Sequence, residues 1–262
     1  MLQLKKSVVL ASLRLPFREA LGVAARMGAE GVEINARTEL RPAELSQTGI
    51  RQIRKWLGDF NLSVSCVQFP TNQGYESLER IDERIEGTKA AMRLANDLGC
   101  RIVSNRVGPI PSDQADSRRG TLTAALHDLA AYSLKSGAWL AIRTGTNSGP
   151  ELADLLSGFP QGALAIDFDP AELMIFRHSP EEAMKALGQA VAHFRARDAV
   201  RDMSSGSTME VQLGRGTIDF SNLFGMLEEH QYRGFISVER NQETGSAFEC
   251  SQALEYLEQL FS

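Results

Sequence analysis

Short apolar runs rich in β-branched residues alternate along the chain with longer segments of helical period. This alternation is typical of repeated strand-helix units built on a parallel sheet. Eight strands are predicted, at Val8–Ser12, Gly31–Ala36, Leu62–Phe69, Arg101–Val107, Trp139–Thr144, Ala163–Asp169, Val191–Arg197 and Gly234–Arg240. Eight amphipathic helices are predicted, at Pro16–Met27, Ile50–Phe60, Ile81–Leu98, Leu122–Leu134, Glu151–Leu156, Pro180–Leu187, Asn222–Glu229 and Ala247–Leu260. Eight repeats indicate that the sheet closes into a (β/α)8 barrel.

Glycine recurs where a predicted helix ends and the next strand begins, at Gly28, Gly99 and Gly137. Glycine suits the left-handed position that terminates a helix. No Gly-rich phosphate turn follows the first predicted strand, as an open dinucleotide-binding sheet would require. The longest irregular segment, Gly108–Arg118, has the length of a loop, and no linker divides the chain. We therefore expect one α/β domain, a TIM barrel, over residues 1–262.

Composition narrows the functional classes. At 262 residues the chain can bury a large core. A formal net charge of −5 and the lack of a basic run argue against a nucleic-acid partner. The N-terminal apolar stretch, Val8 to Leu13, has no signal-peptide pattern, so no membrane partner and a cytoplasmic location are expected. The widely spaced Cys66, Cys100 and Cys250 predict neither a disulfide framework nor a zinc site, and are interpreted as buried small hydrophobic residues.

The strand period of two sends alternate side chains into the barrel. In the eighth predicted strand, Ile236 and Val238 suit the helix-facing side, which leaves Ser237 and Glu239 for the interior. The same reasoning on four other strands places these residues inward: Glu33, Asn35, Arg37, Ala141, Arg143, Ala165, Asp167, Asp169, His193, Arg195 and Arg197. The charged ones lie toward the C-terminal strand ends, where barrel enzymes place active sites. Burying them for stability alone would be costly, so a functional mouth is the better explanation; the alternative is a solvated ring of ion pairs.

Five segments resemble the xylose isomerase-like superfamily of sugar isomerases and epimerases. They are Gly31–Ile34, Asp169–Glu172, His193–Asp198, Leu213–Phe220 and Tyr232–Glu239. The last two are the most specific, because an LGxGxxDF loop followed by a GxxxVE strand is hard to produce by chance. The resemblance spans nearly the whole chain. It implies a TIM barrel and a small carbohydrate or polyol derivative as ligand.

The resemblance also implies a divalent cation held by a Glu, an Asp, a His and a Glu from the fifth to eighth strands. Here the sixth and eighth positions are Asp169 and Glu239, whereas the fifth is Arg143 and the seventh Arg195. A guanidinium stays protonated and offers a metal no lone pair, but it can balance and pair with a carboxylate. We therefore predict a metal-independent barrel without a cofactor. The alternative is one Mn, Mg, Co or Zn ion held weakly by Asp169 and Glu239.

Two functions follow from this substitution. In an isomerase or epimerase, Glu239 would be the base beside Asp169, and Arg143 and Arg195 would stabilise the enediolate. In a non-catalytic carbohydrate-binding or regulatory barrel, the arginines would close the old metal site through ion pairs. The enzyme hypothesis loses if both arginines are tied to the carboxylates without an open pocket. A DNA-repair endonuclease of the same fold would need a His-rich zinc cluster, which four histidines do not supply.

Other charged side chains around the predicted mouth are candidates for substrate binding. They are Glu33, Arg37, Asp167, His193, Arg197, Asp198, Arg215 and Arg240. Simpler interpretations stay open: His193 as a satisfied core group, Glu33 as the partner of an arginine, and Arg197–Asp198 as a local salt bridge.

Three questions stay open at this point. If one strand is misplaced by two residues, Asp167 or His193 would complete an altered metal site. Glu172 and His178 either reach the site or face water. The sequence does not determine the oligomeric state, although barrels that resemble this one often form homodimers.

Overall fold

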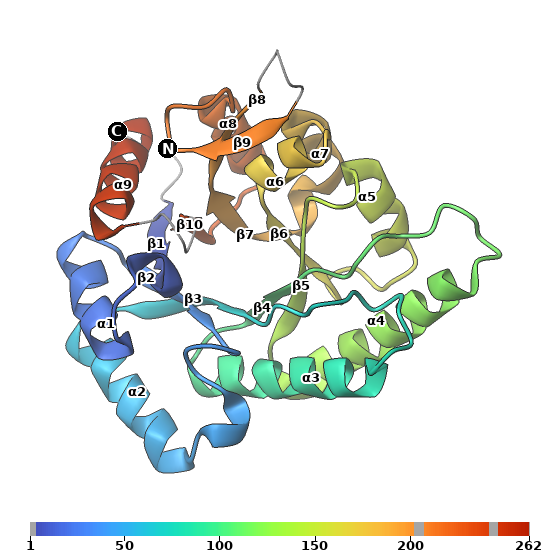
Figure 1. Ribbon diagram of the computed structural model, residues 1–262, viewed down its shortest axis with the longest axis horizontal. Coiled ribbons are helices and arrows are strands. Elements are labelled where there is room, and N and C mark those ends of the chain that lie inside the picture. Colours follow the sequence, from blue (N-terminus) through green and yellow to red (C-terminus); the bar gives the residue numbers. More distant parts are fainter. Residues whose placement is uncertain (1–3, 202–206, 241–245, 262) are drawn as a thin grey trace.

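The computed structural model describes residues 4–201, 207–240 and 246–261. Its parallel strands close into an eight-stranded barrel, with helices around the outside (Figure 1). The strands in barrel order are β1 (Lys5–Val9), β10 (Phe235–Val238), β7 (Val191–Ala196), β6 (Ala165–Phe168), β5 (Trp139–Arg143), β4 (Ile102–Asn105), β3 (Ser63–Gln68) and β2 (Gly31–Asn35). The predicted (β/α)8 barrel is confirmed.

The outer layer consists of amphipathic helices that bury one face against the strands. The α-helices are α1 (Phe17–Arg26), α2 (Gln47–Asp59), α3 (Ile81–Asp97), α4 (Ser117–Ser136), α5 (Gly149–Ser157), α6 (Pro170–Ile175), α7 (Pro180–Leu187), α8 (Phe220–Glu229) and α9 (Ala247–Phe261). Short 3-10 helices are η1 (Leu10–Leu13), η2 (Pro42–Glu44) and η3 (Gly188–Ala190). The helix-ending glycines Gly28, Gly99 and Gly137 adopt φ values of 80°, 80° and 72°, as predicted from their positions. No helix among the described residues has the length and apolarity needed to span a bilayer.

The first strand differs from its predicted position at Val8–Ser12. The strand ends at Val9, and the apolar residues that follow form the 3-10 helix η1. Leu10 and Leu13 are buried in this helix just as they would be in a strand, so hydrophobicity alone does not locate the strand end. Ser12 fixes η1 to the end of β10, because its hydroxyl accepts a hydrogen bond from the Arg240 N–H at 3.0 Å.

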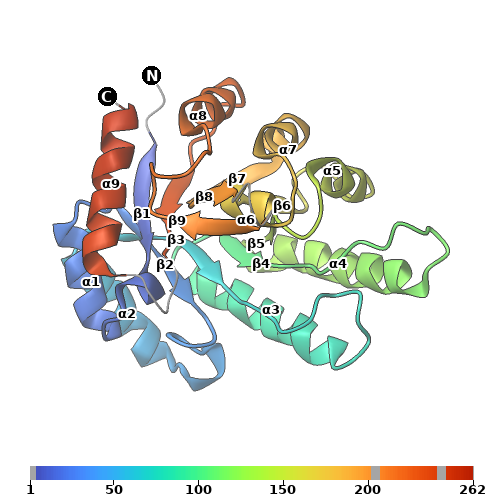
Figure 2. The ribbon, with the colours of Figure 1, turned by 45° about the horizontal axis from the view of Figure 1, so that its top comes forward.

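An antiparallel hairpin that was not predicted follows β7. It consists of β8 (Asp198–Arg201) and β9 (Thr208–Val211). The hairpin contacts α6, which was also not predicted, and Figure 2 shows β8, β9 and α6 grouped together. Strands and helices this short carry too few periods for a sequence pattern to reveal them. This group of elements stands at the C-terminal end of the barrel strands.

The main apolar core lies between the strands and the helices. Phe168 and Phe194 stack there with ring centroids 5.5 Å apart, and Phe224 of α8 packs on Phe194 at 5.4 Å. The barrel interior is polar instead. Near its N-terminal end the hydroxyls of Ser7 and Ser65 lie 2.7 Å apart. Small serines leave space above them, and charged side chains fill that space.

Candidate functional site

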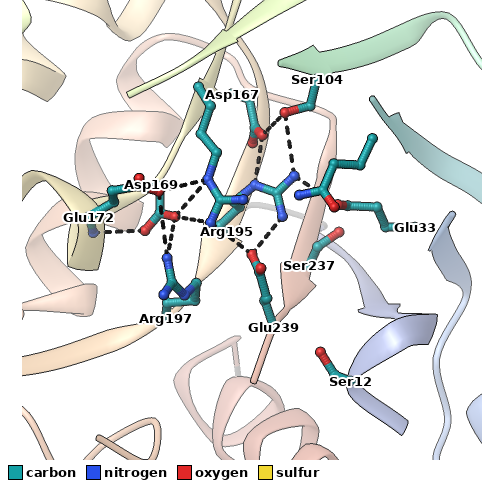
Figure 3. Close-up of polar contacts among 12 residues, drawn as sticks. Ser12, Glu33, Ser104, Asp167, Asp169, Glu172, Arg195, Arg197, Ser237 and Glu239 are labelled. Atoms are coloured by element: carbon teal, nitrogen blue, oxygen red, sulfur yellow. Dashed lines mark hydrogen bonds and ion pairs between the residues drawn. The ribbon is translucent and has the colours of Figure 1, made fainter. Parts of the chain in front are cut away.

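Arg195 of β7 lies at the centre of the barrel interior, and its side chain has no exposed surface. Its Nε donates to Asp167 at 2.6 Å, its Nη2 to Glu33 at 2.8 Å and its Nη1 to Glu239 at 2.7 Å (Figure 3). Burial alone would lower the pKa of Arg195, but these three carboxylates raise it well above its usual value. Arg195 is therefore a permanent buried cation, each of whose three nitrogens donates to a carboxylate.

Arg143 of β5 forms the second centre of the network. Its Nη2 donates to Asp169 Oδ2 at 2.6 Å and to Glu239 Oε2 at 3.0 Å, and its Nε lies 2.9 Å from Glu172 Oε2. Only 4% of the Arg143 side chain is exposed. Glu239 Oε2 thus accepts from both Arg143 and Arg195. The predicted convergence of Arg143, Asp169, Arg195 and Glu239 inside the barrel is confirmed.

A third arginine ties the hairpin to this network. Arg197 Nη1 donates to Asp169 Oδ2 at 2.7 Å, and its Nη2 donates to Glu210 of β9. Glu210 also accepts from Arg240 Nη1 at 3.0 Å. Two arginines from the predicted mouth therefore hold β9 through one glutamate. Glu210 was not among the predicted site residues because it lies in β9 of the hairpin, which was not predicted.

Glu172, whose position the sequence left open, joins the network from α6. It forms a two-pronged ion pair with Arg106, with Nε–Oε1 and Nη2–Oε2 distances of 2.7 Å. Gly145 makes room for it, since a side chain at this position (φ 141°) would collide with Glu172. Arg106 was not predicted as a site residue. It lies two residues after Ser104, so alternation places both on the inward side of the fourth strand, and the Ser104 hydroxyl donates to Asp167.

His193 lies one layer deeper than Arg195, as the strand alternation predicts. Its Nδ1 is 2.7 Å from Asp167 Oδ1 and its Nε2 is 2.7 Å from Ser237 Oγ. The ring is fully buried. His193 is therefore held by the barrel interior and does not face the mouth.

Asp198 holds a loop rather than facing the barrel axis. Its carboxylate accepts from the N–H groups of Ala199 at 2.9 Å, Gly214 at 3.0 Å and Gly216 at 2.8 Å. A side chain at Gly216 would collide with the Asp198 carboxylate, which explains the second glycine of the LGxGxxDF loop. The loop thus folds around Asp198.

Besides Asp198, two more predicted substrate-binding residues lie outside the network. Arg37 is exposed and stacks over the Phe69 ring, with 4.5 Å between the guanidinium carbon and the ring centroid. Arg215 is also exposed, in the loop that Asp198 holds. His178, left open by the sequence, has its Nε2 3.4 Å from the carbonyl oxygen of Thr146.

A cavity of about 450 Å3 opens beside the network, beyond the C-terminal ends of β3, β4 and β5. It is lined by Thr71, Asn72, Gln73, Gly74, Glu76, Ser77, Arg106, Gly108, Pro109 and Thr146. Neither this cavity nor the other four described for residues 4–201, 207–240 and 246–261 is lined by Arg143, Asp169, Arg195 or Glu239. The Arg143 and Arg195 side chains are 4% and 0% exposed, so the centre of the network is buried, and the polar cavity lies at its edge.

The guanidinium groups change the pKa values of the carboxylates around them. Burial would raise the pKa of Asp167 and of Asp169, but Arg195 holds the first and Arg197 and Arg143 hold the second well below the usual range. In the same way Arg143 and Arg195 overcome burial and lower the pKa of Glu239 to about 2.

These shifts predict steep acid unfolding. A carboxyl whose pKa is lower in the folded state stabilises the fold above its unfolded pKa, near 4, and loses this contribution as the pH falls. Burial raises the pKa of Glu33, so this group has the opposite effect on stability, but it is one carboxyl against three whose pKa values are lowered. We expect the melting temperature to fall by on the order of 10 °C between about pH 4 and pH 2. Circular dichroism melts across this range measure it, and a flat profile would contradict the ion pairs described here.

A closed (β/α)8 barrel with a charged C-terminal mouth defines a TIM-barrel protein. The chain belongs to the xylose isomerase-like TIM barrel family, whose model matches residues 21–260. The solved xylose isomerase domain protein from Planctomyces limnophilus is 21% identical, with a TM-score of 0.83 over 92% of this chain and 91% of that one.

Two further solved structures have the same fold. A xylose isomerase-like TIM barrel protein from Mycobacterium smegmatis, in complex with magnesium, is 15% identical, with a TM-score of 0.78 over 93% of this chain and 87% of that one. A D-allulose 3-epimerase from Methylomonas sp., in complex with D-allulose, is 19% identical, with a TM-score of 0.77 over 99% of this chain and 98% of that one. At such identities the likeness shows the fold alone. No curated protein matches the chain.

Proposed function

We propose that this barrel binds a small carbohydrate or polyol derivative without divalent-metal chemistry. One observation carries the proposal: Glu239 Oε2 accepts a hydrogen bond from Arg143 at 3.0 Å and another from Arg195 at 2.7 Å. The residues at the metal position implied by the family resemblance therefore do not fit a divalent cation. Two guanidinium groups occupy the space between the remaining carboxylates, offer no lone pair and repel positive charge.

The same contacts weigh against Glu239 as a catalytic base. A general base works best when its pKa lies near the working pH, whereas Arg143 and Arg195 lower the pKa of Glu239 to about 2. Arg195 already donates to carboxylates through all three of its nitrogens, and Arg143 through Nε and Nη2, which leaves few donors for an enediolate oxygen. A metal-independent isomerase is the second candidate. One feature favours this candidate: 15% of the Glu239 side chain is exposed, more than of Arg143, Asp169 or Arg195.

The ligand fits best in the 450 Å3 cavity at the edge of the network. Its hydroxyl, amide and guanidinium groups suit the hydroxyls of a polyol, and its volume lies within the range of small-molecule sites. Arg106 connects it to the closed centre, because this residue lines the cavity and pairs with Glu172. The D-allulose 3-epimerase structure, which was solved in complex with D-allulose, supports the ligand class.

Thermal stabilisation by a panel of ketoses, sugar acids and inositols, with and without chelator, tests the proposal. We expect one ligand class to raise the melting temperature equally in both conditions, without conversion of the ligand. Thr146→Val should weaken this effect, because it removes a hydroxyl from the cavity wall, whereas Arg215→Ala, an exposed control, should not. Turnover that a chelator abolishes would contradict the proposal, and so would a panel without any stabilising ligand.

A further inference from the structure

A second polar group lies beneath Arg195, deeper in the barrel. Glu33 of β2, Cys66 of β3 and His193 of β7 each direct one potential ligand atom to a common point, and these atoms all lie within 4.8 Å of one another. All three side chains are fully buried. Glu33 Oε2 is 3.7 Å from His193 Nε2 and accepts no hydrogen bond within the described part of the chain. A buried carboxylate oxygen without a partner is costly, which calls for an explanation.

The hydrogen bonds of His193 prepare its Nε2 to be a ligand. Asp167 Oδ1 lies 2.7 Å from Nδ1, so Nδ1 donates to this carboxylate and Nε2 is the nitrogen that remains for a ligand. Metal-bound histidines are commonly oriented in this way, by a carboxylate on the other ring nitrogen. Ser237 Oγ now lies 2.7 Å from Nε2. An ion at Nε2 therefore requires the Ser237 side chain to turn about χ1 to another staggered rotamer, which moves its Oγ away from the nitrogen.

Charge favours a cation at the same point. Glu33 and Asp167 bring two negative charges into the deep interior, and Arg195 brings one positive charge. These three side chains leave one negative charge without compensation away from water, since Glu239 already balances Arg143. A divalent cation that displaces the proton of the Cys66 thiol would make the group neutral.

We propose that Glu33, Cys66 and His193 form a buried zinc site. Thiolate, imidazole and carboxylate together suit Zn2+, whereas Mg2+ and Mn2+ prefer oxygen ligands. With zinc–ligand distances of about 2.0–2.3 Å, tetrahedral ligands lie roughly 3.3–3.8 Å apart, so the three atoms need to approach by only about 1 Å. The site is separate from Asp169 and Glu239, and it would link β2, β3 and β7 beneath the arginines. It goes beyond the proposed ligand-binding function and does not depend on it.

Cobalt substitution tests this site, because Co2+ bound by a thiolate has a near-ultraviolet charge-transfer band. The full chain is produced in zinc-poor medium with added cobalt, so that the ion can enter during folding. We expect about one equivalent of cobalt and the band in the wild type. Cys66→Ser should lose the band and most of the metal. Cys250→Ser, which alters another fully buried thiol, should keep both.

Two results would overturn the zinc proposal: a wild type without cobalt, or a band that persists in Cys66→Ser. The same experiment separates it from the proposed function. Cobalt that is retained in Cys66→Ser without the band, and lost on Asp169→Asn, would locate the ion at the mouth. That outcome would refute both the proposal of a mouth without a metal and the proposal of a thiolate site. Loss of cobalt in Cys66→Ser, in contrast, refutes neither proposal.

Discussion

The double variant Arg143→Glu, Arg195→His should bind Mn2+ at least ~100-fold more tightly than the wild type. The two replacements supply a carboxylate and an imidazole beside Asp169 and Glu239, which completes the ligand set implied by the family resemblance. They also remove two buried cations that repel the ion. Isothermal titration with Mn2+ measures the change, since manganese accepts these oxygen and nitrogen ligands.

The matched control makes the same two replacements outside the network, as Arg37→Glu, Arg215→His on exposed side chains. This control should bind Mn2+ no better than the wild type. Stability measured with and without Mn2+ covers the case in which the double variant folds poorly, because a bound ion stabilises the fold by mass action. Tight Mn2+ binding by the wild type, or a folded double variant that does not bind the ion, would refute the account of the mouth.

Arg195→Met should lower the free energy of unfolding by about 3–5 kcal/mol, the usual result of removing one partner from buried ion pairs. The change leaves Glu33, Asp167 and Glu239 without the guanidinium that each of them contacts within 2.8 Å. Methionine fills much of the volume of the arginine side chain, so the loss of stability reports the missing charge rather than a cavity. Denaturant unfolding at neutral pH measures it.

Two further variants make the Arg195 result specific. Arg215→Met, on an exposed side chain, should stay within about 0.5 kcal/mol of the wild type. Asp167→Asn in the Arg195→Met background should recover part of the loss, because it removes one of the carboxylates left unpaired. Equal stability of Arg195→Met and the wild type would show that these contacts contribute nothing.

Much of the barrel could be predicted because the buried faces of strands and helices require apolar residues at regular spacings along the sequence. Seven strands lie within their predicted ranges, since apolar residues bounded by glycine or polar segments identify them. The first strand was misplaced because Leu10 and Leu13 are buried in a 3-10 helix as deeply as in a strand. The alternation of Ile236 and Val238 with Ser237 and Glu239 also predicted which side chains enter the barrel.

Pairing between distant side chains could not be predicted in the same way. Glu210 holds Arg197 and Arg240 from a hairpin whose strands have four residues each, too short for a periodic signal. Arg37 follows the inward alternation of β2, yet it lies beyond the end of the strand, where the pleat no longer directs it, and is exposed. Alternation still directs Asp169 and Glu239, one residue beyond the ends of β6 and β10, but not Arg37, two residues beyond the end of β2.

The sequence by itself determined the fold class, the inward faces of five strands and the presence of arginine at two positions where the family resemblance implies metal ligands. These are local properties, encoded in the period of the strands and helices. Only the tertiary structure decided which charges meet. It brought Glu239 onto both Arg143 and Arg195, and it brought Cys66 to Glu33 and His193. The physical reason is that ion pairs and ligand sets depend on distances between separate strands, which closure of the barrel sets and spacing along the chain does not.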